Sequence, residues 1–154
     1  MPDVRTVPLP ADSRLHALRR PGDFLDCYGV ASAMSPRAAA GIITDFPDWA
    51  RGLLQVRRLV TSPFGLSQDG PEAPDKVGPF PVEYDDEAEL VAGFDDKHLN
   101  FRVSVMSQGG QVSLATWVDP HNLGGRLYLA AIMPFHIAIA RNALARVARA
   151  PAVA

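Results

Sequence analysis

The strict alternation of apolar and polar residues between positions 88 and 119 is the feature that most constrains the fold of this chain. An apolar side chain at every second position predicts a β-strand that buries one face and exposes the other. The apolar positions form three runs: Leu90, Ala92 and Phe94; Leu99, Phe101, Val103 and Val105; and Val112, Leu114, Thr116 and Val118. The pattern therefore predicts three strands that share one apolar face.

Two turn signals predict how these strands pair. Gly109-Gly110 is typical of a two-residue hairpin turn, and Asp96-Lys97 is a second candidate turn. Both registers keep the apolar residues of all three strands on one face of an antiparallel sheet. The first turn pairs Phe101 with Val118, Asn100 with Asp119 and Arg102 with Trp117, and the second pairs Asp95 with His98, Phe94 with Leu99 and Ala92 with Phe101.

The preceding part of the chain predicts one strand and two short helices. We expect the strand at residues 24–32. Ser35-Pro36 begins a helix that runs to about residue 45, because a capping hydroxyl followed by proline favours a helical first turn, and Pro47 begins a second helix. The prolines and glycines between residues 70 and 81 predict a long loop.

A wide apolar face distinguishes the last element, a helix expected at residues 126–149. Such a helix must be covered along much of its length, and Pro134 is expected to kink it. The order of elements indicates an α+β architecture, in which a curved antiparallel sheet of five or six strands wraps around this long C-terminal helix. We expect residues 1–21 to be a loosely held arm, residues 22–150 to be one domain and residues 151–154 to be a tail.

Composition excludes some classes of protein. The chain of 154 residues has 15 Lys+Arg and 17 Asp+Glu, a net charge of −2, which argues against a broad nucleic-acid surface. The longest apolar stretch, Leu127–Ala140, is shorter than the roughly 18 consecutive apolar residues of a membrane span. With no secretory signal visible, we expect a soluble, cytoplasmic protein. Its single cysteine, Cys27, is expected to be a small buried strand residue rather than a nucleophile.

Six short motifs stand out: Phe46-Pro47-x-Trp49, Gly78-Pro79-Phe80-Pro81, Asp95-Asp96-Lys97-His98-Leu99-Asn100-Phe101-Arg102, His121-Asn122, Gly125-Arg126-Leu127-Tyr128 and Pro134-Phe135-His136. As a set they resemble one bacterial family, catalogued as domain of unknown function twenty-eight sixty-seven. The family is similar to the helix-grip, START-like (SRPBCC) superfamily, whose members hold apolar ligands between the sheet and the long helix. The resemblance therefore implies a helix-grip domain with a hydrophobic cavity, and it implies no particular reaction.

Polar residues of the alternating strands are expected to meet at one end of the sheet. In the two predicted registers, His98 lies opposite both Asp95 and His121. Two imidazoles and a carboxylate can bind a transition metal or form an acid–base pair. A solvent-exposed face, with Arg102 stacked on Trp117, explains the same pattern. We take His98, Asp95 and Arg102 as candidate catalytic residues, with Arg102 holding an anionic group, and expect no metal and no cofactor.

A second group of candidates is expected in the interior, beside the long helix. His136 follows Pro134 on that helix, so it is expected to bond a freed backbone carbonyl or a polar group of the core. The alternative is that His136 and Tyr128 anchor a ligand, since ligand pockets combine apolar walls with a few polar groups. The candidate ligand-binding residues are Tyr128, His136, Phe101, Trp117, Ile132 and Phe135.

Three functions from different classes fit these observations. The leading hypothesis is a small-molecule-binding protein that holds an apolar or amphipathic molecule between the sheet and the C-terminal helix. The alternative is an enzyme of the same fold, cyclase- or hydrolase-like, that uses His98 and Asp95 as an acid–base pair. A further alternative is a protein-interaction module whose partner covers the acidic segment at residues 69–96. A homodimer is compatible with the sequence.

Overall fold

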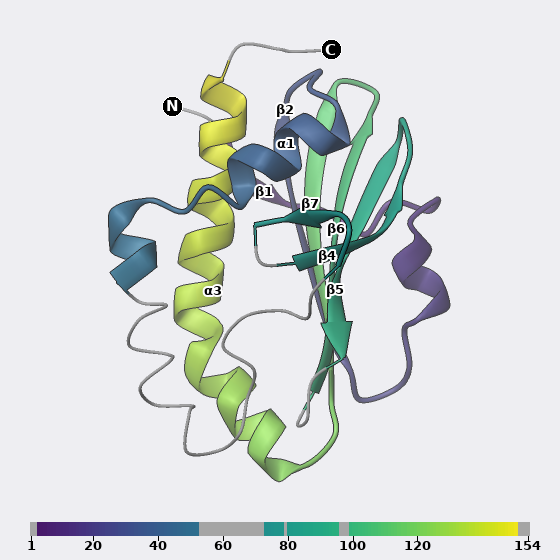
Figure 1. Ribbon diagram of the computed structural model, residues 1–154, viewed down its shortest axis with the longest axis vertical. Helices are drawn as coiled ribbons and strands as arrows, with labels where there is room; N and C mark the ends of the chain where they lie inside the picture. Colours follow the sequence, from purple (N-terminus) through teal and green to yellow (C-terminus); the bar gives the residue numbers. More distant parts are fainter. Residues whose placement is uncertain (1–2, 53–72, 79, 96–98, 151–154) are drawn as a thin grey trace.

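One antiparallel sheet with two helices on the same face forms the centre of the fold (Figure 1). The structure is a computed structural model that describes residues 3–52, 73–78, 80–95 and 99–150. The strands follow the spatial order β1-β2-β7-β6-β5-β4-β3. In chain order the elements are β1 (Arg5–Thr6), the 3₁₀-helix η1 (Arg14–Ala17), β2 (Phe24–Ala31), α1 (Pro36–Ile43), β3 (Lys76–Val77), β4 (Phe80–Asp85), β5 (Glu89–Asp95), β6 (Leu99–Gln108), β7 (Gln111–Pro120) and α3 (Leu123–Arg149). The α+β prediction is confirmed, and the arrangement is consistent with a sheet that wraps around a long C-terminal helix.

The hairpin of β6 and β7 confirms the first predicted register. Gly109 and Gly110 form the turn, with φ angles of 58° and 78°, in the region that glycine adopts without steric cost. As predicted, Phe101 pairs with Val118, Asn100 with Asp119 and Arg102 with Trp117.

The second predicted register, between β5 and β6, is wrong by two residues. Asp95 pairs with Asn100, Phe94 with Phe101 and Ala92 with Val103. The connection is therefore longer than the two residues that we expected. Since side chains alternate with a period of two, a shift of two residues leaves every side chain on its predicted face. His98, the expected partner of Asp95, lies outside the described residues.

The long loop expected at residues 70–81 is wrong from residue 76 onward, because β3 and β4 form there. β3 is the edge strand and β4 lies between it and β5. Pro81 of β4 pairs with Lys76 of β3 but with no residue of β5, so the proline lies where one side of the strand is unpaired and its missing N–H is tolerated. A register shift between Val82 and Tyr84 marks a further irregularity in β4. With β1 at the opposite edge, the sheet has seven strands rather than the five or six that we expected.

The helices also follow the predicted starts. Ser35 caps α1 by accepting a hydrogen bond from Ala38 N at 3.2 Å, and Pro36 occupies the first helical position. Residues 48–52 are helical after Pro47, and the rest of the expected second helix lies outside the described residues. The C-terminal helix α3 begins at Leu123, slightly earlier than predicted, with Asn122 as its N-cap.

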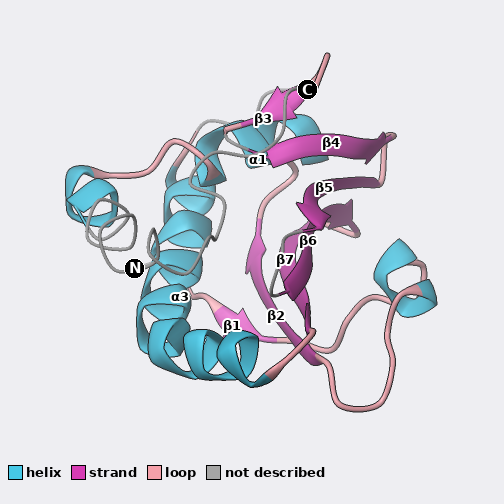
Figure 2. Cartoon of the chain, turned by 60° about the horizontal axis from the view of Figure 1, so that its bottom comes forward, coloured by secondary structure: helices cyan, strands magenta, loops and turns pink. Residues whose placement is uncertain are grey.

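The inner face of the sheet, which packs against α1 and α3, carries the main core (Figure 2). The helix side of this core comes from α1 and from the C-terminal part of α3. Its strand residues alternate with outward-facing ones, as the sequence predicts. The buried members on strands and α3 include Tyr28, Val30, Leu90, Ala92, Val105, Val112, Leu114, Ala140, Ala143, Leu144 and Val147.

The outer face of the sheet is covered by the N-terminal arm, which we had expected to be loosely held. Figure 2 shows η1 on the side of the sheet opposite α3. Leu15 of η1 is fully buried, in a cluster with Cys27, Val91 and Trp117. The prolines of the arm oppose regular structure, but they do not oppose packing. The described part of the arm therefore belongs to the folded domain.

A buried carboxylate ties this arm to the sheet. The side chain of Glu89 on β5 is only 3% exposed, and it accepts three hydrogen bonds. Ser13 Oγ donates to Glu89 Oε2 at 2.7 Å, and Arg14 N donates to Oε1 at 3.0 Å. Ser104 Oγ donates to Oε2 at 2.5 Å. A buried carboxylate is tolerated when its oxygens are satisfied in this way, so Glu89 fixes the position of η1.

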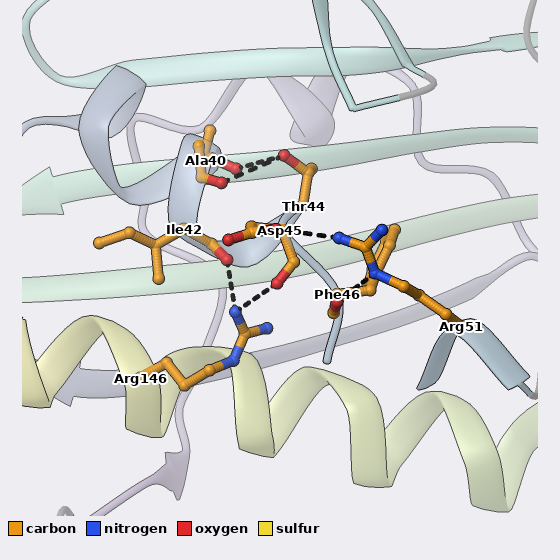
Figure 3. Close-up of polar contacts among 8 residues, drawn as sticks. Ala40, Ile42, Thr44, Asp45, Phe46, Arg51 and Arg146 are labelled. Carbon is orange, nitrogen blue, oxygen red and sulfur yellow. Dashed lines mark hydrogen bonds and ion pairs between the residues drawn. The ribbon is translucent and has the colours of Figure 1, made fainter. Parts of the chain in front are cut away.

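An arginine joins the two inner helices, as Figure 3 shows. Arg146 Nη1 on α3 donates to the carbonyl oxygens of Ile42 and Asp45, both at 2.7 Å. These carbonyls lie at the C-terminal end of α1, where the helix dipole favours a positive charge. Desolvation lowers the pKa of Arg146 from its ordinary value. Arg146 therefore holds α1 against α3 and closes this end of the inner core.

Leu15→Ala tests whether the arm is part of the fold. Removing this fully buried side chain should lower the free energy of unfolding by about 2–5 kcal/mol, because it leaves a cavity. Urea unfolding followed by circular dichroism measures the change. The matched control is Leu123→Ala, since Leu123 is 69% exposed and should cost less than about 0.5 kcal/mol. Equal small losses in both variants would show that the arm is not packed.

Arg146→Met tests the junction of α1 and α3. The variant keeps an apolar stem but loses the hydrogen bonds to Ile42 and Asp45, so we expect a loss of about 2 kcal/mol in the free energy of unfolding. Arg149→Met, at an exposed position of the same helix, is the control and should change stability by less than about 0.5 kcal/mol. An Arg146→Met protein as stable as this control would contradict the assigned role.

Candidate functional site

The inner face of the sheet is not covered evenly along its length. Near α1 and the C-terminal part of α3, its apolar side chains are buried. Toward the N-terminal half of α3, Leu99 and Val118 of the sheet are buried, but several other apolar side chains of both layers are only partly buried. We call this region the inner patch and define it by Phe24, Phe94, Phe101, Ile132 and Met133, with Val103, which also packs against the main core, at its border.

Aromatic side chains stabilise the sheet side of the inner patch. Phe94 and Phe101 form an edge-to-face pair with ring centroids 4.7 Å apart. Phe101 makes a second such pair with Phe80, at 5.5 Å. Rings that pack edge to face keep a defined geometry even when they are not fully buried. The inner patch is therefore an ordered apolar surface.

A carboxylate and an imidazole lie beside the inner patch. Asp26 on β2 lies two residues from both Phe24 and Tyr28, so its side chain is on the same, inner face of the sheet. Its backbone pairs with Thr116 of β7. His136 Nε2 on α3 lies 2.9 Å from Asp26 Oδ2, and the rings of His136 and Phe24 pack edge to face with centroids 6.2 Å apart. An ionised carboxylate can only accept, so Nε2 is the donor. The pair is a polar bridge between sheet and helix.

The pairing of Asp26 is incomplete. Its side chain is 15% exposed and that of His136 is 21% exposed, so both are largely removed from water. Asp26 Oδ1 is buried and has no hydrogen-bond partner. Burying a carboxylate costs several kcal/mol unless its oxygens find partners. Among the described inner-face positions of β2, β5, β6 and β7, Asp26 is the one charged residue.

The structure brings together some of the predicted ligand-binding residues and separates others. Phe101 and Ile132 lie in the inner patch, His136 lies beside it, and Tyr128 is half-buried one turn from Ile132. Trp117 does not belong with them, because it packs on the outer face in the cluster with Leu15. There its Nε1 donates to Asp23 Oδ2 at 2.6 Å.

Phe135 is also separate from this group, since it is 49% exposed on α3. It belongs to an exposed apolar side of the helix that includes Leu123, Leu127 and Ile137. The expectation that α3 is covered along much of its length is therefore wrong for these positions. The most apolar stretch of 18 residues in α3 has a mean hydropathy of 1.4, and 11% of that stretch is buried. By length and composition this helix resembles a membrane span, although core helices of soluble proteins pass the same test.

Two of the predicted catalytic residues, Asp95 and Arg102, lie on the outer face, away from α3. Arg102 is 13% exposed, and its Nε lies 2.7 Å from Glu83 Oε1. Its Nη2 lies 3.0 Å from Asp95 Oδ1. Two carboxylates therefore already neutralise this guanidinium, which leaves it little attraction for an anionic substrate. Asp95 is 64% exposed, and His98 lies outside the described residues.

A hollow between the arm and the β6–β7 hairpin offers less chemistry. It has a volume of about 300 Å³ and lies on the outer face. Its lining contains no titratable side chain, so it supplies no acid, base or nucleophile: Val7, Pro8, Pro10, Met106, Gln108, Gln111 and Ser113. The described residues contain no group of three or more His, Cys, Asp or Glu side chains placed to hold a metal ion.

Sequence reasoning predicted His136 but missed its partner. The signal for Asp26 was present, because alternation along β2 places it on one face with Phe24, Tyr28 and Val30. A carboxylate among buried apolar side chains needs a hydrogen-bond donor or a cation as its partner. The pairing itself joins residues 110 positions apart, and no local pattern predicts a contact over that distance.

The fold and this site place the chain in the α+β class, with an antiparallel sheet, a long C-terminal helix and a polar pair between them. Comparison with family models gives a match over residues 18–143 to the family described as "Protein of unknown function (DUF2867)". The chain belongs to this family, as its motifs predicted. We found no match among curated proteins and none among solved structures.

Cys27 is the single thiol of the chain, and its environment opposes nucleophilic chemistry. It is 2% exposed on the outer face. Burial, reinforced by the negative charge of Asp26, raises the pKa of its thiol from 9.0 to about 11. Because the thiolate is the reactive form, the prediction of a buried structural cysteine is confirmed by its position.

Alkylation of Cys27 with iodoacetamide tests this assignment. At about pH 8 the raised pKa lowers the thiolate fraction about 100-fold, and burial slows access further. We therefore expect the folded protein to react at least about 100-fold more slowly than the protein in denaturant. Comparable rates in the two states would contradict a buried, protonated thiol.

Proposed function

We propose that this protein binds a small apolar or amphipathic molecule between the inner face of the sheet and the N-terminal half of α3. The observation that carries the proposal is the inner patch, an ordered apolar surface that is only partly buried and lies beside a polar pair. Sites for small molecules combine apolar walls with a few polar groups in the same way. The ligand lies against Phe101, Val103, Ile132 and Met133, and Asp26 with His136 binds its polar end.

The two ends of the inner face have separate roles in this proposal. The end closed by α1 and Arg146 carries the buried core and supplies stability. The end beside the N-terminal half of α3 keeps apolar side chains partly exposed, and a ligand that covers them gains about 25 cal/mol for each Å² of apolar surface removed from water.

The helix-grip fold and a START-like origin belong to this proposal. The seven-stranded antiparallel sheet and the long C-terminal helix support them, and such domains hold apolar ligands in the same place. We propose further that the protein acts in the cytoplasm, with no nucleic-acid partner. The acid–base alternative has less support, because Asp95 and Arg102 lie on the outer face and pair with each other.

A bulky substitution in the inner patch tests the proposed site. The neutral fluorescent dye N-phenylnaphthylamine should bind the wild-type protein with increased emission. Met133→Trp should weaken this binding at least about tenfold, because the larger ring fills the space that the ligand needs. Equilibrium titration measures both affinities, and thermal unfolding verifies that the variant is folded.

The matched control is Leu127→Trp on the same helix, since Leu127 is 62% exposed. This variant should bind the dye like the wild-type protein. A wild-type protein that does not bind the dye, or a Met133→Trp variant that binds it normally, would contradict the proposed site. Loss of binding in Leu127→Trp alone would place the dye on the exposed side of α3 instead.

A further inference from the structure

The unpartnered oxygen of Asp26 defines what a ligand of the inner patch must carry. Oδ2 of this carboxylate is bonded to His136 Nε2 at 2.9 Å, whereas Oδ1 is buried without a partner. A carboxylate oxygen accepts hydrogen bonds and has none to donate while it is ionised. The missing partner is therefore a donor, and none of the described side chains supplies it.

From this geometry we infer that the ligand is an amphipathic molecule whose polar end is a hydrogen-bond donor, an alcohol or an amine. Its O–H or N–H group bonds to Asp26 Oδ1, while its apolar part covers the inner patch. The inference rests on the proposed function, because it assigns the head group of the same ligand. A donor that reaches Oδ1 satisfies an oxygen that otherwise remains unpaired in the interior.

The same geometry disfavours a ligand with a carboxylate head group. A second carboxylate beside Asp26 brings two negative charges together in a site largely removed from water, where such repulsion is strong. The described inner-face positions of β2, β5, β6 and β7 hold no cation, and Arg141 of α3, which lies over the Tyr28 ring, donates to the carbonyl oxygen of Val4 at 2.7 Å. The N–H group at His136 Nε2 already donates to Asp26 Oδ2. It is therefore not available to bond a carboxylate head group of the ligand.

Binding of four compounds with the same ten-carbon chain tests the inference: decane, decanol, decylamine and decanoate. Displacement of N-phenylnaphthylamine from the wild-type protein measures their affinities. We expect decanol and decylamine to bind at least about tenfold more tightly than decanoate, and also more tightly than decane, because only the first two donate to Asp26. The alcohol and the amine are separate arms, and their order identifies the preferred donor.

Variants of the polar pair connect the preference to Asp26. Asp26→Leu, which removes the acceptor, should abolish the preference for decanol over decane. His136→Gln, whose amide can donate to Oδ2 in place of the imidazole, should retain it. Asp119→Asn changes a half-buried carboxylate at an outer-face position of β7 and is the control that should behave like the wild-type protein. Asp26→Asn, a smaller change, should reduce the advantage of decylamine over decane if Asp26→Leu does not fold.

The outcomes separate this inference from the proposed function. If none of the four compounds binds, the proposed function fails and the inference fails with it. If all four bind with equal affinity, or if decanoate binds best, the apolar site stands and the donor inference is overturned. A preference for decanol that persists in Asp26→Leu also overturns it.

Discussion

The central sheet has an apolar inner face and, on its mixed outer face, an apolar cluster around Trp117, and both must be covered by other elements of the fold. The inner face packs against α1 and α3, and the outer face packs against the N-terminal arm around Leu15. Polar groups fix each cover at a defined place. Glu89 holds the arm through three hydrogen bonds, and Arg146 holds α1 against α3. Apolar surface left uncovered in water is unfavourable. Glu89 and Arg146 therefore fix where the arm and α1 cover the sheet.

The candidate site arises where this cover is least complete. Along α3, the buried positions Ala140, Leu144 and Val147 give way to half-buried ones at Ile132 and Met133. Asp26 and His136 lie at this transition, where the core ends and the inner patch begins. A buried carboxylate with one unpaired oxygen lowers stability, and such local conflicts are typical of positions kept for function rather than for folding. The same pair therefore explains why a ligand would bind here and which head group it would carry.

Sequence patterns predicted the inner face better than they predicted its surroundings. The glycine turn gave the β6–β7 register correctly, and the error of two residues between β5 and β6 changed no face, because strand side chains alternate with a period of two. β4 was missed because its one proline, Pro81, is tolerated only where one side of the strand is unpaired, and that is a property of the whole sheet. The packing of the arm depends on Leu15, against whose cluster Val7, Leu9 and Leu18 also pack, and the irregular spacing of these residues gives no periodic signal. Trp117 was assigned to the ligand site although alternation places it on the face opposite Thr116. The contact of Asp26 with His136 joins distant parts of the chain, so it required the structure.

The most direct test of the account is to locate a bound ligand by nuclear magnetic resonance of the methyl-labelled protein. Decanol is titrated into the sample, and the shifts of the isoleucine, leucine and valine methyl groups are followed. The account predicts the largest changes at Val103 and Ile132, which line the inner patch, and small changes at Val147 in the buried core. Changes confined to Leu123 and Leu127, on the exposed side of α3, or no changes at saturating decanol, would contradict it.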